Sequence, residues 1–97
     1  MKKMDNKEDL YSKFNQLKKQ LKEQEWPSVY MFKFICPSDS ETLAKVTALF
    51  SGQENISFRA SRNGNYTSVS AKELMLNPEE IIDIYVKAAQ IKGVITL

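Results

Sequence analysis

The first quarter of the chain places apolar residues among charged ones with the period of an α-helix. Four apolar residues follow one another at intervals of four, three and four positions, which puts them along one side of a helix. Their neighbours are mostly Lys, Glu and Gln, which favour helices. We therefore expect a basic amphipathic helix over residues 5–24, ended by Trp26-Pro27 because proline cannot continue a helix. Its apolar stripe consists of Leu10, Phe14, Leu17 and Leu21.

Residues 28–36 have the two-residue period of a β-strand and are rich in β-branched and aromatic residues. Successive side chains of a strand point to opposite faces of the sheet. One face therefore receives Tyr30, Phe32, Phe34 and Cys36, and the other receives Val29, Met31, Lys33 and Ile35. We expect the first face to lie in the core.

Two later segments carry the signals of helix starts. Ser38 and Glu41 are spaced as in a capping box, which predicts a helix that ends near residue 51. The pair Asn77-Pro78 combines a cap residue with a proline at the first helical position, and Glu80 follows three residues after the cap. This pattern predicts a second helix.

The dipeptide Asn63-Gly64 lies between two alternating runs and favours a two-residue type I′ hairpin turn, because both residues tolerate positive φ. Such a turn sets a register in which Phe58 faces Val69 and Arg59 faces Ser68. All apolar side chains of the two strands then share one face. We expect Phe58 to lie in the core.

The elements after the leading helix follow in the order strand, helix, strand, strand, helix, strand, the last strand being short, over 94–97. Right-handed crossovers place both helices on one face of a single sheet. We predict an α+β fold, a two-layer ferredoxin-like βαββαβ sandwich whose antiparallel sheet has the order 4-1-3-2. This domain spans 26–97, and the helix of 1–25 precedes it. The other face of the sheet is left open.

The residues that most catalytic sites need are missing or isolated. The chain has no histidine, which removes the commonest general base and metal ligand. A single cysteine, Cys36, cannot form a zinc site or an internal disulfide. The three glycines are too scattered to cradle a phosphate. We expect a non-enzymatic protein with no catalytic residues, no metal and no cofactor.

The formal charge of +2 belongs to the leading helix. Residues 1–25 carry seven Lys against five acids, whereas residues 26–97 carry seven basic and seven acidic groups. Such a balanced domain does not attract nucleic acid by bulk charge, so nucleic acid is not expected as a partner. The sequence begins without the apolar core of a secretory signal and has no apolar run of about 18 residues. We expect a cytoplasmic protein without a membrane partner.

The open sheet face is the candidate binding surface, since cations and hydroxyls should gather there on a neutral domain. The alternative is an ordinary solvated face, because antiparallel sheets commonly expose one side to water. The candidate residues for a ligand or partner are Lys33, Arg59, Ser61, Arg62, Tyr66, Ser68, Ser70 and Lys72.

Part of the same face is apolar, because Val29, Met31 and Ile35 would be exposed if nothing covered them. The stripe of the leading helix also needs a partner. We expect one to cover the other, either within a chain or between two chains. Two apolar surfaces on so small a domain also predict a homodimer.

The segment 61–70, with the letters SRNGNYTSVS, resembles the hairpin of the YbeD-like family of small bacterial proteins of unknown function. Trp26-Pro27, the strand around Lys33 and the last helix are similar as well, so the resemblance covers about 26–97. It implies a ferredoxin-like fold, a shape like that of ACT regulatory domains, which bind small effectors at paired subunits, and no catalytic residues. The long leading helix departs from the family's short lead-in.

These observations lead to a non-catalytic regulatory or adaptor protein. Its partner would be a small anionic metabolite or another protein, bound on the open sheet face or at a dimer seam. The alternative is single-stranded RNA, which RRM domains of the same fold bind on that face. The third strand lacks their aromatic motif, and Tyr66 is the one aromatic residue well placed to stack on a base.

Overall fold

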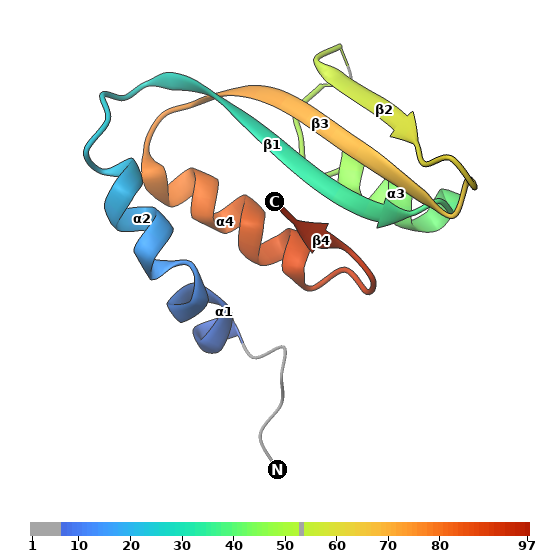
Figure 1. Cartoon of the computed structure of the whole chain (residues 1–97). Coiled ribbons are helices and arrows are strands. Elements are labelled where there is room, and N and C mark those ends of the chain that lie inside the picture. Colours follow the sequence, from blue (N-terminus) through green and yellow to red (C-terminus); the bar gives the residue numbers. More distant parts are fainter. Residues whose placement is uncertain (1–6, 53) are drawn as a thin grey trace.

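Helices and strands alternate along most of the chain in the computed structural model, which describes residues 7–52 and 54–97 (Figure 1). The elements are α1 Lys7–Lys13, α2 Asn15–Leu21, β1 Ser28–Pro37, α3 Ser40–Thr47, β2 Ile56–Ala60, β3 Tyr66–Met75, α4 Pro78–Ala89 and β4 Ile95–Thr96. From β1 onward their order is the one that the sequence predicts. No helix of the described residues is long and apolar enough to cross a membrane.

The strands form one antiparallel sheet in the order β2-β3-β1-β4, which is 4-1-3-2 read from the opposite edge. The central strands β1 and β3 pair from Ser28 opposite Met75 to Pro37 opposite Tyr66. The short strands β2 and β4 form the edges. Helices α3 and α4 cover one face of the sheet, so the fold is an α+β arrangement of two layers (Figure 1).

An aromatic core lies between the sheet and these two helices. Phe32 and Phe34 of β1 are fully buried, and their rings lie 5.3 to 6.2 Å from those of Phe50 and Tyr85. The Tyr85 and Tyr30 hydroxyls are hydrogen-bonded at 3.0 Å. Burial and this hydrogen bond raise the pKa of Tyr85. The predicted inward face of β1 is confirmed.

Helix α3 begins one residue later than the capping-box pattern predicts. Its N-cap is Asp39, whose carboxylate accepts hydrogen bonds from the Thr42 amide at 2.8 Å and the Thr42 hydroxyl at 2.9 Å. The Ser38 hydroxyl is instead hydrogen-bonded to the Thr67 hydroxyl at 2.8 Å. The assignment of Ser38 as the cap is therefore wrong, because a contact with β3 holds its side chain. The helix also ends at Thr47, short of residue 51.

Helix α4 begins as predicted. The Asn77 side chain accepts a hydrogen bond from the Glu80 amide at 3.0 Å, and the Glu80 carboxylate accepts one from the Leu76 amide at 3.0 Å. Pro78 occupies the first turn, where its missing N–H costs nothing. The bond to Asn77 satisfies one of the backbone donors that a helix start leaves unpaired, and the bond to Glu80 satisfies the amide that precedes the cap residue.

The leading segment is two helices, because a turn at Phe14 separates α1 from α2. The single helix predicted over 5–24 is thus wrong for the described residues, and positions 5 and 6 lie outside them. Trp26 donates its indole N–H to the carbonyl of Leu21 at 2.8 Å, where α2 ends. The apolar stripe is buried within the chain: Leu10, Phe14 and Leu21 are buried and Leu17 is half-buried.

Both leading helices pack against α4 and leave the open sheet face uncovered (Figure 1). The Phe14 and Tyr85 rings stack at 5.4 Å. The Tyr11 hydroxyl donates to the Asp83 carboxylate at 2.6 Å. The expectation that the stripe covers Val29, Met31 and Ile35 of β1 within one chain is therefore wrong, because the stripe packs against α4 instead. The arrangement between two chains and the homodimer stay predictions.

The β2–β3 hairpin keeps the predicted register but not the predicted turn. Phe58 lies opposite Val69 and Arg59 opposite Ser68, as expected. Among the described residues only glycines have positive φ, which excludes a type I′ turn at Asn63. The Gly64 amide, at φ 77°, donates to the Ser61 carbonyl at 3.0 Å and forms a different turn.

Phe58 is 54% exposed, so its predicted place in the core is wrong. Its side chain does share the helix-covered face with Val69, but β2 is an edge strand. Helix α3 packs mainly on β1 and reaches little of β2. The alternation of the strand thus predicts correctly on which face of the sheet Phe58 lies. How deeply Phe58 is buried depends instead on where α3 lies.

Candidate functional site

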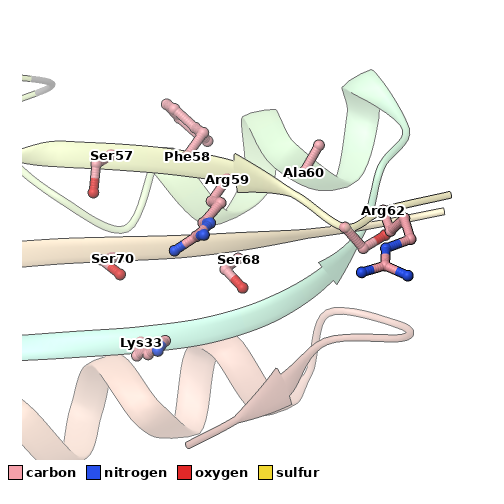
Figure 2. A pocket seen from close by; sticks show the side chains of 9 residues that line it. Lys33, Ser57, Phe58, Arg59, Ala60, Arg62, Ser68 and Ser70 are labelled. Atoms are coloured by element: carbon pink, nitrogen blue, oxygen red, sulfur yellow. The ribbon is translucent and has the colours of Figure 1, made fainter. Parts of the chain in front are cut away.

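Three strands bring cations and serines together on the open face of the sheet (Figure 2). They line a shallow depression of about 780 Å³, which we call the cationic depression. Figure 2 shows Arg59 and Ser57 pointing away from Phe58 and Ala60, as alternation on β2 requires. The polar side chains that line the depression are Lys33, Ser57, Arg59, Ser61, Arg62, Ser68 and Ser70.

The register of the sheet fixes how these side chains are arranged. Ser70 of β3 lies between Ser57 of β2 and Lys33 of β1 in one row across the sheet. Arg59 and Ser68 form the next row. Neighbouring strands are about 4.8 Å apart, and the two rows are two residues apart along β3, so the backbones that carry Arg59 and Lys33 are roughly 12 Å apart. Two long cationic side chains can therefore converge on an anion above the β3 serines.

The charge of the depression is not compensated within the described chain. None of its lining residues is acidic, and none of the ion pairs among the described residues involves Lys33, Arg59 or Arg62. The hydroxyls of Ser57, Ser68 and Ser70 have no hydrogen-bond partner in that part of the chain either. The depression thus offers cations and free hydroxyl donors, the groups that bind phosphates and carboxylates.

Three of the predicted site residues have other positions or partners, and the first two are Ser61 and Lys72. The Ser61 hydroxyl donates to the Asn63 side chain at 3.0 Å and accepts from the Tyr66 amide at 3.1 Å, so it stabilises the hairpin loop. Lys72 lies beside a separate depression of about 270 Å³ that also contains Glu54.

Tyr66 lies at the end of β3 and is 48% exposed, but it does not line the cationic depression. Its position opposite Pro37 places it on the open face. The other exposed aromatic residue of the hairpin, Phe58, projects to the helix-covered face. No pair of exposed aromatic side chains therefore forms on the open face of the hairpin.

Aliphatic side chains flank the cationic depression, and sequence analysis identified only those of β1. Leu74 lies opposite Val29, and Ile95 of β4 lies opposite Ile35. Val29, Met31, Leu74 and Ile95 are all more than half exposed. The pairing of Ile95 was not readable from the pattern, because it depends on which residues the two-residue strand β4 meets.

The one cysteine lies away from this surface. Cys36 is fully buried on the helix-covered face of β1, and burial raises the pKa of its thiol. Such a thiol is a poor nucleophile because it stays protonated. The described residues contain no group of three or more His, Cys, Asp and Glu side chains that could hold a metal ion.

The comparisons with known proteins identify a family. Residues 21–97 match the model of a family described as a protein of unknown function, DUF493. No curated protein and no solved structure matches the chain significantly. The matched segment begins at the last residue of α2 and includes the whole sheet, α3 and α4, in agreement with the resemblance noted for 26–97. The chain belongs to this YbeD-like family of unknown function.

Proposed function

We propose that this protein is a non-catalytic regulatory or adaptor module that binds a small, multiply charged anion in the cationic depression. The supporting observation is the unpaired charge of Lys33, Arg59 and Arg62 above serines that have free hydroxyls. A hydrogen bond to a charged group contributes about 1.5–3 kcal/mol, less where water screens it. A ligand with several oxygens would engage more than one of these groups at once.

Binding without turnover is the simpler function for these residues. The chain has no histidine, and its thiol is buried on the opposite face of β1. The side chains of the depression can hold and orient an anion, but the serines lack an adjacent general base. We further propose that the domain is ferredoxin-like, with the shape of ACT regulatory domains, and that it acts in the cytoplasm.

The test is a titration with inorganic pyrophosphate followed by two-dimensional NMR of the amides. We expect shifts centred on Ser57, Ser68 and Ser70, and an affinity that falls as NaCl is added. Arg59→Ala and Lys33→Ala should each weaken binding roughly five- to tenfold through loss of a charge-assisted hydrogen bond. Succinate in place of pyrophosphate distinguishes a carboxylate site from a phosphate site.

Lys87→Ala is the matched control, because Lys87 is exposed in the last turn of α4 and does not line the depression. It removes the same charge from the whole molecule. Equal weakening by Lys87→Ala and Arg59→Ala would mean that only bulk charge matters and would refute the site. The site would also be refuted if neither pyrophosphate nor succinate, at about 10 mM, shifted the amide signals.

The alternative of single-stranded RNA would need a second exposed aromatic side chain next to Tyr66, because such proteins stack successive bases. The open face of the hairpin offers only one. A small anion therefore fits the surface better than an RNA strand does. If the protein retained oligouridine on a filter at about 50 mM salt, and Tyr66→Ala abolished this retention, RNA would be the better-supported ligand.

A further inference from the structure

Strand β2 is an edge of the sheet with unpaired backbone groups. The Ser61 amide donates to the Tyr66 carbonyl at 2.7 Å, and the Lys72 amide donates to the Asn55 carbonyl at 3.1 Å. Residues alternate along an antiparallel ladder between those that bond to the neighbouring strand and those that face away. The N–H and C=O groups of Ile56, Phe58 and Ala60 therefore point outward from β3. Such a row is a template for another strand.

The helix side of this edge is apolar. A third depression, of about 400 Å³, lies between β2 and α3, and we call it the β2–α3 depression. One side of α3 lines it at helical spacing, and Phe58 lines it from the strand. Phe58 is more than half exposed there although it is aromatic. The lining residues are Ser40, Leu43, Ala44, Thr47 and Phe58.

The opposite side of the same edge is cationic. Arg59 projects to the open face, and Arg62 follows in the hairpin loop (Figure 2). Neither forms an ion pair with the described residues. A strand laid along β2 would thus have apolar contacts on one face and arginine contacts on the other.

We propose that β2 binds an extended segment of another protein, which adds to the sheet as an antiparallel fifth strand. Residues of that segment opposite Ile56, Phe58 and Ala60 would exchange backbone hydrogen bonds, and their side chains would enter the β2–α3 depression, so they are apolar. Residues between them would face Arg59 and are acidic. The chemistry of the partner is therefore an alternation of apolar and acidic residues.

Charge complementarity favours this partner over a second copy of the chain. The strand Ile56–Ala60 contains no acidic residue. Antiparallel pairing of two copies about Phe58 would set the two Arg59 residues on the same face, with backbones roughly 8 Å apart. No carboxylate of β2 could neutralise them. An acidic segment removes this repulsion, whereas a second copy creates it.

The proposal goes beyond anion binding, because the backbone edge and the β2–α3 depression are separate from the serines of β3. The probe is the capped peptide Val-Glu-Val-Glu-Val with a fluorescent label, titrated with the full chain and followed by fluorescence polarisation. We expect saturable binding that Val-Lys-Val-Lys-Val does not reproduce. No binding of the acidic peptide at about 1 mM would refute the proposal.

Two substitutions of Phe58 distinguish the contribution of its backbone N–H from that of its side chain. Phe58→Pro removes the outward N–H without breaking a hydrogen bond to β3, and proline is tolerated on the free side of an edge strand. Phe58→Val removes the ring but keeps the N–H. We expect the affinity for the acidic peptide to be at least about tenfold lower in Phe58→Pro than in Phe58→Val. Equal affinities in the two variants would refute strand addition.

Charge reversal and self-association complete the test. Arg59→Glu should reverse the preference, so that the lysine peptide binds better than the glutamate peptide. An unchanged preference would refute the acidic pattern. A concentration-dependent dimer of the free chain that Phe58→Pro abolishes would assign the edge to a second copy and overturn the proposal. Pyrophosphate binding should survive Phe58→Pro, so failure of one hypothesis is distinguishable from failure of the other.

Discussion

Two phenylalanines of the sheet show how position alone decides what a residue contributes. Phe32 is in the middle of β1, fully buried and in contact with the rings of Phe50 and Tyr85. Phe58 is on the edge strand and keeps more than half of its surface in water. Burial of apolar area stabilises a protein by about 25 cal/mol per Å², so the two side chains contribute very differently.

We predict that Phe32→Ala lowers the free energy of unfolding by about 3–5 kcal/mol, because it leaves a cavity in the core. Phe58→Ala should cost no more than about 1 kcal/mol, since water already reaches the ring. Urea denaturation of both variants measures the difference. Equal losses would mean that Phe58 is covered in solution, and a cost that depends on protein concentration would identify a second copy as the cover.

Single residues also show which features of the site the sequence pattern could predict and which it could not. The alternation of β2 and β3 predicted the register and the faces, and with them the convergence of Arg59, Ser68 and Lys33. It could not predict that Phe58 is exposed, because depth depends on α3. Nor could it identify Ile95 as a neighbour of Ile35, since a two-residue strand has no pattern of its own.

At the scale of the elements, the start of α3 is capped by Asp39. Asp39 accepts hydrogen bonds from both the amide and the hydroxyl of Thr42, and the amide bond is the main reason that the pKa of Asp39 lies below its usual value. A carboxyl whose pKa is lowered by folding favours the folded state when ionised. This contribution is present at pH values above the ordinary pKa of an aspartate, about 3.9, and is lost as the pH falls through the lower pKa of folded Asp39.

We therefore predict that Asp39→Ala lowers stability at pH 7 and that the gap between variant and wild type narrows as the pH falls below about 4. Thermal unfolding at several pH values measures this gap. Ser38→Ala is the control suggested by the capping-box pattern, and its effect should be independent of pH because a hydroxyl does not titrate there. A constant gap for Asp39→Ala would show that the ionised cap does not stabilise α3.

The order of elements was predictable because α3 and α4 carry start signals and the strands β1, β2 and β3 have a two-residue period. The residues at which the helices begin and end were less predictable. Ser38 and Asp39 are both good cap residues, and the bond of Ser38 to Thr67 decides between them. The break at Phe14 follows no Gly or Pro and occurs where the ring stacks on Tyr85, a contact with a helix some seventy residues later.

At the scale of the whole molecule, α4 packs on two sides. Ile81, Tyr85 and Ala88 follow the helical spacing of the sheet-facing side and are buried. Ile82 and Val86 are also buried, and they share a side with Glu79, which pairs with Lys18 of α2 at 3.7 Å. The leading helices therefore cover a second apolar face of α4, and the family match includes that face but not α1.

We predict that a chain of residues 21–97 is less stable than the full chain by roughly 3 kcal/mol or more, because it loses Leu10 and Phe14 and exposes Ile82 and Val86. The substitution Ile82→Lys tests whether this loss of stability comes from uncovering α4 or only from shortening the chain. In the full chain it places a charge under the leading helices and should cost roughly 3 kcal/mol or more. In the shortened chain the same position is exposed, and the cost should be near zero.

Urea denaturation of the four proteins gives the coupling between the two changes, and binding of a hydrophobic dye reports the exposed face directly. Dye binding should appear in the shortened chain and decrease again with Ile82→Lys. If Ile82→Lys costs the same in both lengths, the leading helices do not cover α4, and the stripe of Leu10, Phe14, Leu17 and Leu21 would then be available to another chain, as the sequence left open. A large difference would establish that the leading helices are a second layer over α4, so that the open sheet face and the β2 edge, and not the stripe, are available to a partner in the described part of the chain.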